Sequence, residues 1–207
     1  SAYHRAAKWT RDVVQHYEIN LRRMVSIAKQ AGAEIVFVAP ASNIKDSSPF
    51  KSEPVRNLSA SEADELIGRL DAAKSMIRAQ QYDEALDELA AARAIDSGRA
   101  DVEFYRGKAL FAAGRFDEAT KAFDAAMQLD VCPLRALPEM KQAIRRVAND
   151  QQVPAVKSGD LLIDKCLTDD GHQCVGHEYF LDHVHPTIEV HQHLARWIID
   201  ELQEARI

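Results

Sequence analysis

Two stretches of this sequence repeat one another: Gln81-Tyr-Asp-Glu-Ala-Leu-Asp-Glu-Leu-Ala-Ala-Ala-Arg-Ala-Ile-Asp96 and Arg115-Phe-Asp-Glu-Ala-Thr-Lys-Ala-Phe-Asp-Ala-Ala-Met-Gln-Leu-Asp130. They align without gaps at an offset of 34 residues, which matches Tyr82 with Phe116, Ala85 with Ala119, Leu89 with Phe123, and Ala92 with Ala126. The surrounding segment, residues 59–131, is rich in alanine, has helical periodicity and contains no strand pattern. A period of this length in helical sequence predicts stacked helix hairpins.

The repeated unit resembles the tetratricopeptide repeat, a helix hairpin with a period of 34 residues. In the second copy the positions that this pattern reserves for small or aromatic residues hold Gly107, Gly114, Phe116, Ala119, Phe123 and Ala126. Small residues let the two helices approach closely, and aromatic residues fill the groove between hairpins. In the first copy Ala73 replaces Gly107 and Gln80 replaces Gly114. We therefore expect two repeats, at about 66–99 and 100–133, in a module that spans residues 59–131.

The resemblance implies a helical surface that binds a protein or peptide. Residues 59–131 hold 9 Lys or Arg and 15 Asp or Glu, a net charge of −6, which equals the net charge of the whole chain. These charges are typical of a solvated helix surface, and a concave acidic surface would favour a basic partner. Because a solenoid usually needs about three repeats, both a short groove and an intramolecular spacer remain open.

The flanks of this module have an α/β pattern. Residues 10–31 form an amphipathic helical pattern that stops at Gly32, and Ile35–Ala39 is an apolar run typical of a strand buried on both faces. Residues 42–56 predict a long polar loop. After the repeats we expect a helix at about 136–149, a strand at 153–156, a loop at 166–179 and a last helix at 187–202. The predicted fold is an α/β domain, in segments 1–58 and 132–207, with an inserted all-α module, helix-dominated overall.

Composition excludes several classes of protein. Of the 207 residues, 46% are hydrophobic, enough for a core, and the 26 Lys and Arg against 32 Asp and Glu argue against a nucleic-acid binder. The longest apolar stretch, residues 35–41, is too short for a membrane span. The start at Ser1 and Ala2, without an initiator Met or signal peptide, is interpreted as a processed or truncated chain. The compartment stays open between the cytoplasm and an extracytoplasmic location behind an upstream anchor.

A second motif is Phe180-Leu-Asp-His-Val-His-Pro-Thr187, in which Asp182 and His185 are three residues apart on a turn. Such a carboxylate can accept a hydrogen bond from imidazole Nδ1–H and leave Nε2 as a general base. On local spacing alone, the simpler interpretation is a capping aspartate and a solvated histidine.

The motif resembles the Asp-x-x-His motif that precedes the final helix of SGNH (GDSL-type) hydrolases and supplies two members of a Ser-His-Asp triad. The order of the flanking elements is similar to the last third of that fold, and residues 43–53 and 132–135 resemble segments of members with embedded tetratricopeptide repeats. The resemblance implies part of a three-layer parallel sheet, His185 as base and Asp182 as its orienter. It also implies Asn43 and Arg135 at the pocket rim, where loops meet the carboxyl ends of the strands.

The chain departs from that family in its catalytic motifs. It has no Gly-Asp-Ser nucleophile, oxyanion glycine or Gly-x-Asn-Asp loop, which the resemblance implies lie upstream of Ser1. We therefore expect a non-catalytic interaction module within a hydrolase-like protein. The alternatives are the base-bearing part of an esterase, deacetylase or acyltransferase, and a degenerate scaffold. Absent strands would leave the edge of residues 35–39 unpaired, so we expect a homo-oligomer through this edge, a cover over it, or aggregation.

The histidines and cysteines allow one further hypothesis. Six of the eight histidines lie between His172 and His193, near Cys166 and Cys174. A zinc set of Cys166, His172, Cys174 and His177 lacks the two compact ligand pairs of structural zinc motifs, so we expect no metal and no cofactor. Cys166 and Cys174 would form a disulfide in an exported protein and remain thiols in a cytosolic one. Cys132 is interpreted as a packing residue.

Overall fold

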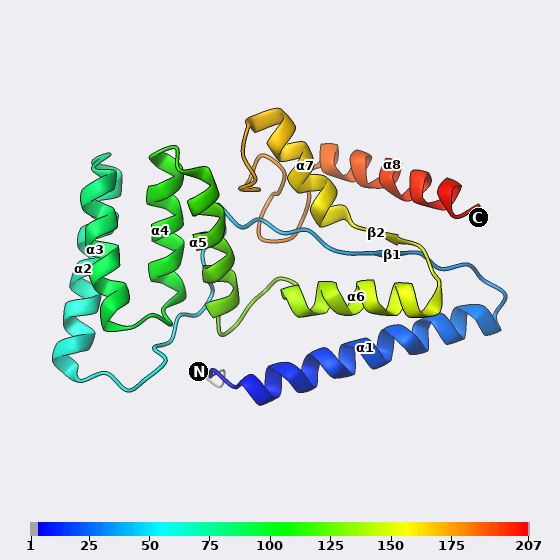
Figure 1. The fold of residues 1–207 in the computed structure, drawn as a ribbon, viewed down its shortest axis with the longest axis horizontal. Helices are drawn as coiled ribbons and strands as arrows, with labels where there is room; N and C mark the ends of the chain where they lie inside the picture. The colour runs from blue at the N-terminus through cyan, green and yellow to red at the C-terminus, as the bar shows by residue number, and fades with distance from the viewer. Residues whose placement is uncertain (1–3, 207) are drawn as a thin grey trace. The chain divides into compact units, whose positions relative to one another are not determined.

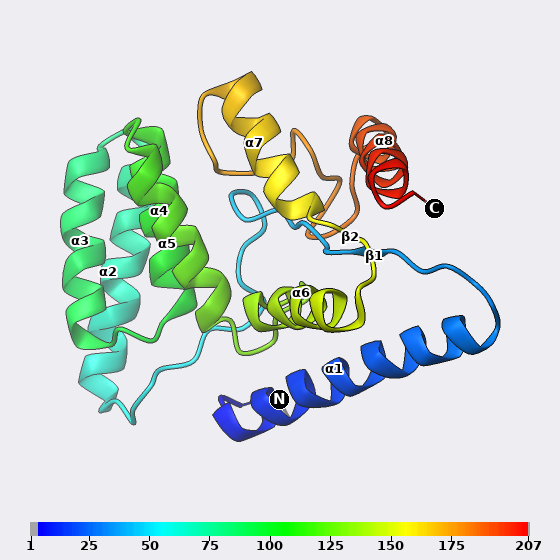
Figure 2. The ribbon, with the colours of Figure 1, turned by 45° about the vertical axis from the view of Figure 1, so that its right-hand side comes forward.

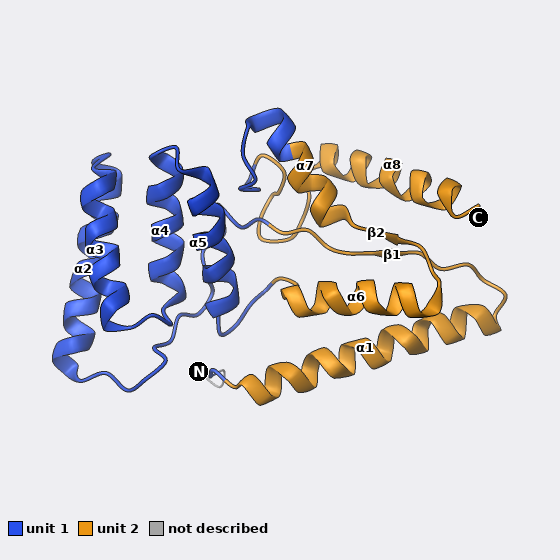
Figure 3. Cartoon of the chain, in the orientation of Figure 1, with its two compact units in different colours: residues 1–5, 43–134, 166–177 blue, residues 6–42, 135–165, 178–207 orange. Residues whose placement is uncertain are grey.

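The computed structural model describes residues 4–206, and the interpretation of Ser1 and Ala2 lies outside them. The chain divides into two compact units, each built from three separate segments (Figure 3). Among the described residues, unit 1 comprises residues 4–5, 43–134 and 166–177, and unit 2 comprises residues 6–42, 135–165 and 178–206. Residues 43–58 and 166–177, which lie outside the predicted repeat module, cluster with it in unit 1. The predicted domain boundaries stay a prediction.

Unit 1 is built on two helix hairpins, α2 (Ala60–Arg78) with α3 (Tyr82–Ile95) and α4 (Ala100–Ala112) with α5 (Phe116–Leu129) (Figure 1). α2 begins at a capping box, in which the Ser59 hydroxyl accepts from the Glu62 N–H and the Glu62 carboxylate accepts from the Ser59 N–H. The turn inside each hairpin has one residue in the left-handed region, Gln80 at φ 60° and Gly114 at φ 75°. The prediction of stacked helix hairpins is therefore confirmed, since these helices pack as tetratricopeptide repeats do.

Small residues at aligned positions hold the hairpins together. Ala73, Ala85, Leu89 and Ala92 are buried in one core cluster of the first hairpin. In the second hairpin Phe123 is 1% exposed and lies against Gly107, where an added Cβ would meet the ring at 2.6 Å. The backbone of α4 thus approaches the Phe123 ring more closely than any residue with a side chain allows.

Unit 2 contains a two-stranded parallel sheet, β1 (Phe37–Val38) and β2 (Ala155–Val156), in the register Phe37 to Ala155 and Val38 to Val156. Figures 1 and 2 show α1 (Ala7–Gln30) and α6 (Pro138–Gln151) on one side of the strands. On the other side are the first part of α7 (Ser158–Asp170) and α8 (Ile188–Glu204). The core between α1, α6 and the strands contains Leu21, Val25, Phe37, Ala39, Ala143, Ile144, Val147 and Ala148.

The sheet is smaller than the sequence predicts. Each expected strand, at 35–39 and 153–156, is reduced to two residues, and within residues 4–206 eight helices give a mostly helical fold. Apolar character at 35–39 reports burial, whereas the length of a ladder depends on how much partner strand is available. The N–H groups of Phe37 and Ala39 donate to the carbonyls of Pro154 and Val156, so the backbone N–H and C=O of Val38 face the opposite edge of β1. No strand within the described residues pairs there.

The predicted loop at 166–179 was wrong at its start, because α7 extends to Asp170. The helical signal was present in Leu162 and Cys166, which lie four residues apart and are both buried. No helix of the described residues is both long enough and apolar enough to cross a membrane.

Candidate functional site

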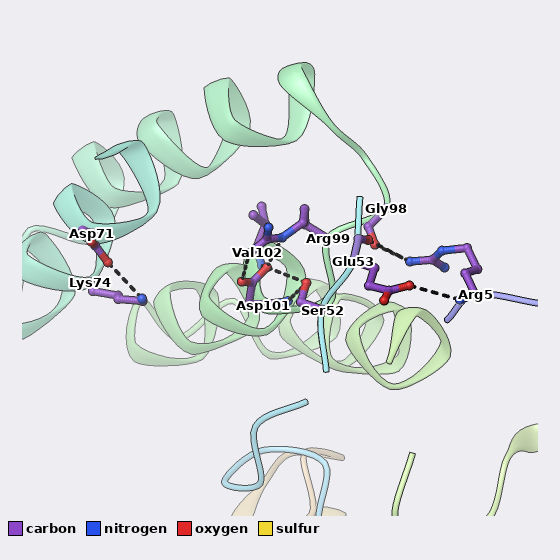
Figure 4. Close-up of polar contacts among 9 residues, drawn as sticks. All are labelled: Arg5, Ser52, Glu53, Asp71, Lys74, Gly98, Arg99, Asp101 and Val102. Atoms are coloured by element: carbon purple, nitrogen blue, oxygen red, sulfur yellow. Dashed lines mark hydrogen bonds and ion pairs between the residues drawn. The ribbon is translucent and has the colours of Figure 1, made fainter. Parts of the chain in front are cut away.

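The first candidate is the face that α2 and α4 present in unit 1. Ile67, Asp71, Lys74 and Arg78 follow one another at helical spacing on one face of α2. Ile67 is 50% exposed, and the Lys74 Nζ lies 3.0 Å from Asp71 Oδ1 (Figure 4). The same Nζ lies 5.1 Å from the ring centroid of Tyr105 on α4, a cation–π distance that ties the two helices. An open surface with apolar, cationic and aromatic groups suits a polypeptide partner.

The corresponding face of the second repeat is covered by the chain itself. The Lys108 Nζ donates to Asp46 Oδ1 at 2.8 Å, and the Lys45 Nζ lies 4.7 Å from the ring centroid of Phe111. Asp46 also accepts from the backbone N–H of His177 at 3.1 Å. Burial opposes ionisation of Asp46, but the hydrogen bonds from Lys108 and His177 outweigh it and lower the pKa of this carboxyl. Asp46 is therefore a charged anchor on the second repeat.

Two segments close the outer side of the second hairpin. The backbone N–H groups of Ile44 and Lys45 donate to the Val175 carbonyl at 3.0 and 3.1 Å, which joins residues 44–45 to the loop after α7. In that loop the His172 ring packs against Phe111 and Phe116, with centroids 4.8 and 5.2 Å apart. Two repeats do not bury their own end faces, and these segments take the place of a further repeat.

A third segment, residues 50–55, runs past the ends of both hairpins and is fastened by two aligned aspartates. Asp130 accepts from the backbone N–H groups of Phe50 and Lys51 at 2.8 and 3.0 Å. Asp96 accepts from the N–H groups of Val55 and Gly98 at 3.0 and 2.8 Å. We call residues 50–55 the strap. Sequence reasoning missed this role, although the identity of Asp96 and Asp130 at the last aligned position of the repeats was the available signal.

Figure 4 shows the polar contacts that surround the strap. Ser52 Oγ donates to Asp101 Oδ1 at 2.8 Å, and Asp101 is also paired with Arg99. The Arg5 guanidinium donates to the carbonyls of Gly98 and Glu53 at 2.8 and 3.1 Å. These bonds fix the strap through its backbone and through the Ser52 side chain, so the strap has a structural role.

The second candidate is the pair Asp182 and His185 in unit 2. His185 Nδ1 lies 2.7 Å from Asp182 Oδ2, and Asp182 Oδ1 accepts from the N–H groups of Val184 and His185 at 2.9 Å each. The bonds from Val184 and His185 lower the pKa of Asp182, so the carboxylate remains ionised. The His185 side chain is 73% exposed. The structure thus brings these two side chains together in the geometry of an oriented imidazole.

The two rim candidates are buried and belong to different units. Asn43 is 2% exposed in unit 1, where its Oδ1 accepts from the Asp46 N–H at 2.8 Å and closes a turn. Arg135 is 7% exposed in unit 2, the unit that also contains Asp182 and His185. A role of either residue at a pocket rim stays a prediction.

Within residues 4–206 the four zinc candidates do not converge on one point. Cys166 Sγ lies 3.3 Å from His172 Nδ1, whereas Cys174 Sγ lies 3.2 Å from Thr120 Oγ1 and His177 contacts Asp46. All three cysteines are free thiols. Cys166 and Cys174 therefore do not form the disulfide that was one of the two expectations for this pair. Cys174 packs in the core cluster of the second hairpin, and this burial raises the pKa of its thiol.

The two helix hairpins of unit 1 form a helical-repeat module. In comparison with known families, residues 76–131 match the model of the tetratricopeptide repeat, from the last turn of α2 to the end of α5. No curated protein and no solved structure matches the chain. The match is consistent with protein–protein interaction, and nothing in these comparisons supports a hydrolase context.

Proposed function

We propose that residues 59–131 act as a protein-interaction module that binds a partner polypeptide on the face of α2 and α4. The match of residues 76–131 to the tetratricopeptide repeat carries this proposal. The exposed Ile67 and the cations Lys74 and Arg78 support it, because they combine apolar contact with hydrogen-bond donors on one helix face. The covered face of the second repeat directs the partner to the first.

A peptide selection tests this function even though the partner is unidentified. Random peptides displayed on phage are selected against the full chain, and the selected peptides are titrated into the 15N-labelled protein. We expect amide shifts that concentrate in α2 and α4 and binding that weakens in Ile67→Glu. Selected peptides whose shifts map outside residues 59–131 would contradict the proposal, as would a selection that yields no binding peptide.

We propose as a second candidate that Asp182 and His185 serve as orienter and general base of an SGNH-type hydrolase or acyltransferase in an intact protein. The 2.7 Å contact between His185 Nδ1 and Asp182 Oδ2 supports this candidate, because it directs Nε2 away from the carboxylate. The nucleophilic serine would have to come from a segment other than residues 1–207, which contain no Gly-Asp-Ser motif.

The test of this second candidate is to sequence the transcript upstream of the codon for Ser1. A strand pattern followed by Gly-Asp-Ser, and then by Gly-x-Asn-Asp, would support the base role and direct an ester-hydrolysis assay to the intact protein. If translation starts near Ser1, or if the upstream strand lacks a nucleophile, the catalytic role fails and the repeat module is the function that remains.

A further inference from the structure

We propose that a pocket of unit 2 binds a free α-amino acid with an apolar side chain, held as a zwitterion by opposite charges on the pocket walls. The pocket has a volume of about 450 Å³ and lies beside β2, with lining residues on α6, α7 and α8 (Figures 1 and 2). All of its lining residues belong to unit 2. Asp182 and His185 are not among them, so the inference is independent of both proposed functions.

The outer edge of β2 is closed to an added strand. The carbonyls of Pro154 and Val156 accept hydrogen bonds from residues 37 and 39, so the N–H and C=O of Ala155 face the other edge. There Glu201 Oε1 accepts from the Ala155 N–H at 3.3 Å. A peptide strand that paired with this edge would have to displace the Glu201 side chain, whereas a small ligand beside it would not. The pocket therefore suits a small molecule.

The α8 side of the pocket offers acceptors for a positively charged group. Glu201 lines the pocket, and no Lys or Arg among the described residues forms an ion pair with it. Its Oε1 is used by the Ala155 N–H, whereas its Oε2 has no hydrogen bond within residues 4–206. The Ala155 carbonyl faces the same edge as the Ala155 N–H. A ligand ammonium group has three N–H donors and can bond both of these oxygens.

The segment after β2 and the helix α6 supply the positive charge. Lys157 lines the pocket, is exposed and forms no ion pair in the part of the chain that the structure describes. Arg145 Nη2 donates to the two Asp160 carboxylate oxygens at 2.8 and 2.7 Å, so these two charges offset each other. Arg145 Nε is buried and has no hydrogen-bond partner among the described residues. Such an orphaned donor is uncommon in folded proteins, and a ligand carboxylate that pairs with Lys157 also offers an acceptor to Arg145.

The charge balance selects a zwitterion over a simple ion. With the ion pair between α6 and α7 set aside as neutral, the pocket keeps one positive charge on Lys157 and one negative charge on Glu201, and these two do not pair with each other. A simple carboxylate would be repelled by Glu201 and a simple amine by Lys157, whereas an α-amino acid satisfies both. The apolar part of the lining, which favours an apolar side chain on the ligand, includes Val153, Pro154 and Leu161.

Leucine and two analogues that each lack one charge test this inference on the unaltered protein. We would titrate L-leucine, 4-methylpentanoate, which lacks the ammonium group, and 3-methylbutylamine, which lacks the carboxylate, into the 15N-labelled full chain. We expect saturable shifts of the amides of residues 155–161 and of Glu201. Each analogue should bind about fivefold or more weakly than leucine, because it loses a charge-assisted hydrogen bond and leaves one pocket charge without a partner.

Two substitutions assign the charges to the pocket walls. Lys157→Gln should weaken leucine binding about fivefold or more and should not weaken the binding of 3-methylbutylamine. Glu201→Gln, which keeps an oxygen for the Ala155 N–H, should also weaken leucine binding but should not weaken the binding of 4-methylpentanoate. Glu204→Gln is the matched control, because Glu204 lies three residues later on α8 and does not line the pocket. This control should bind leucine as the parent does.

Three outcomes would overturn the inference. If either analogue binds as tightly as leucine, the pocket is a site for a simple ion. If no amide shifts at millimolar leucine, or if the shifts map outside residues 145–161 and Glu201, the pocket is not an amino-acid site. If Lys157→Gln and Glu201→Gln both bind leucine as the parent does, the pocket walls do not supply the charges. The phage-selected peptides are scored on α2 and α4, so each of these outcomes leaves the proposed interaction function standing.

Discussion

Because Gly107 lies so close to the Phe123 ring, we expect Gly107→Ala to lower the free energy of unfolding, whereas the same substitution usually raises it in a helix. In most helix interiors Gly→Ala stabilises by about 0.5–1 kcal/mol, because alanine loses less backbone entropy on folding. At Gly107 the new Cβ would lie 2.6 Å from the ring, about 1 Å inside an ordinary contact. Forcing a methyl group into a packed core costs about 1–3 kcal/mol. We therefore expect Gly107→Ala to destabilise the protein by about 1 kcal/mol.

The chain supplies a matched control for this substitution. Gly68 is in α2, and a Cβ at Gly68 would have no neighbour within 4 Å. Gly68→Ala should therefore show the ordinary gain of about 0.5–1 kcal/mol. The assay is urea unfolding followed by far-UV circular dichroism, with amide exchange in α4 and α5 as a local readout because the chain has two units.

The first repeat shows how the strain is relieved. There Ala73 takes the place of Gly107 and Leu89 takes the place of Phe123, and both are buried in one cluster. We expect Phe123→Leu alone to cost about 1 kcal/mol, and Gly107→Ala added to it to stabilise. If Gly107→Ala stabilises the parent as much as Gly68→Ala does, the close contact is not the reason for the glycine and the reasoning is refuted.

Three other predictions concern the strap, the α2 cap and the thiols. Asp130→Ala should destabilise unit 1 by about 2–3 kcal/mol and speed the hydrogen exchange of the Phe50 and Lys51 amides, and Asp130→Asn should have a milder effect. Unchanged exchange rates of these two amides would contradict the role of Asp130 in holding the strap. The hydrogen bond from Arg56, followed by those from Ser59, lowers the pKa of Glu62 to about 2. The stability that the capping box contributes should therefore be complete above pH 4.5 and be lost as the pH falls toward 2. A titration of the Glu62 carboxyl by 13C NMR with its midpoint near pH 4.5 would contradict this. The half-buried thiol of Cys132 should react first with dithionitrobenzoate, and the buried thiols of Cys166 and Cys174 should react only when the protein unfolds. Reaction of all three thiols in a single fast phase would contradict this order.

The sequence by itself determined the helix hairpins. The 34-residue offset, the small residues at aligned positions and the helical periodicity are all local properties of the chain, and they predict the helices α2 to α5. That the Phe123 ring lies against Gly107 within one hairpin is seen only in the structure. The pair of Asp182 and His185 is local as well, because a three-residue separation on a turn brings the side chains together without help from distant segments.

The tertiary structure alone decided how the repeats are completed. The contact of Asp46 with Lys108 joins residues 62 apart, and the bonds from Phe50 and Lys51 to Asp130 join residues 80 and 79 apart. No periodicity in the sequence reports such pairs, since each segment is a polar loop by its own composition. For the same reason, the apolar run at 35–39 indicated burial but not a two-residue ladder. The length of that ladder is set by β2, which lies more than a hundred residues further along the chain.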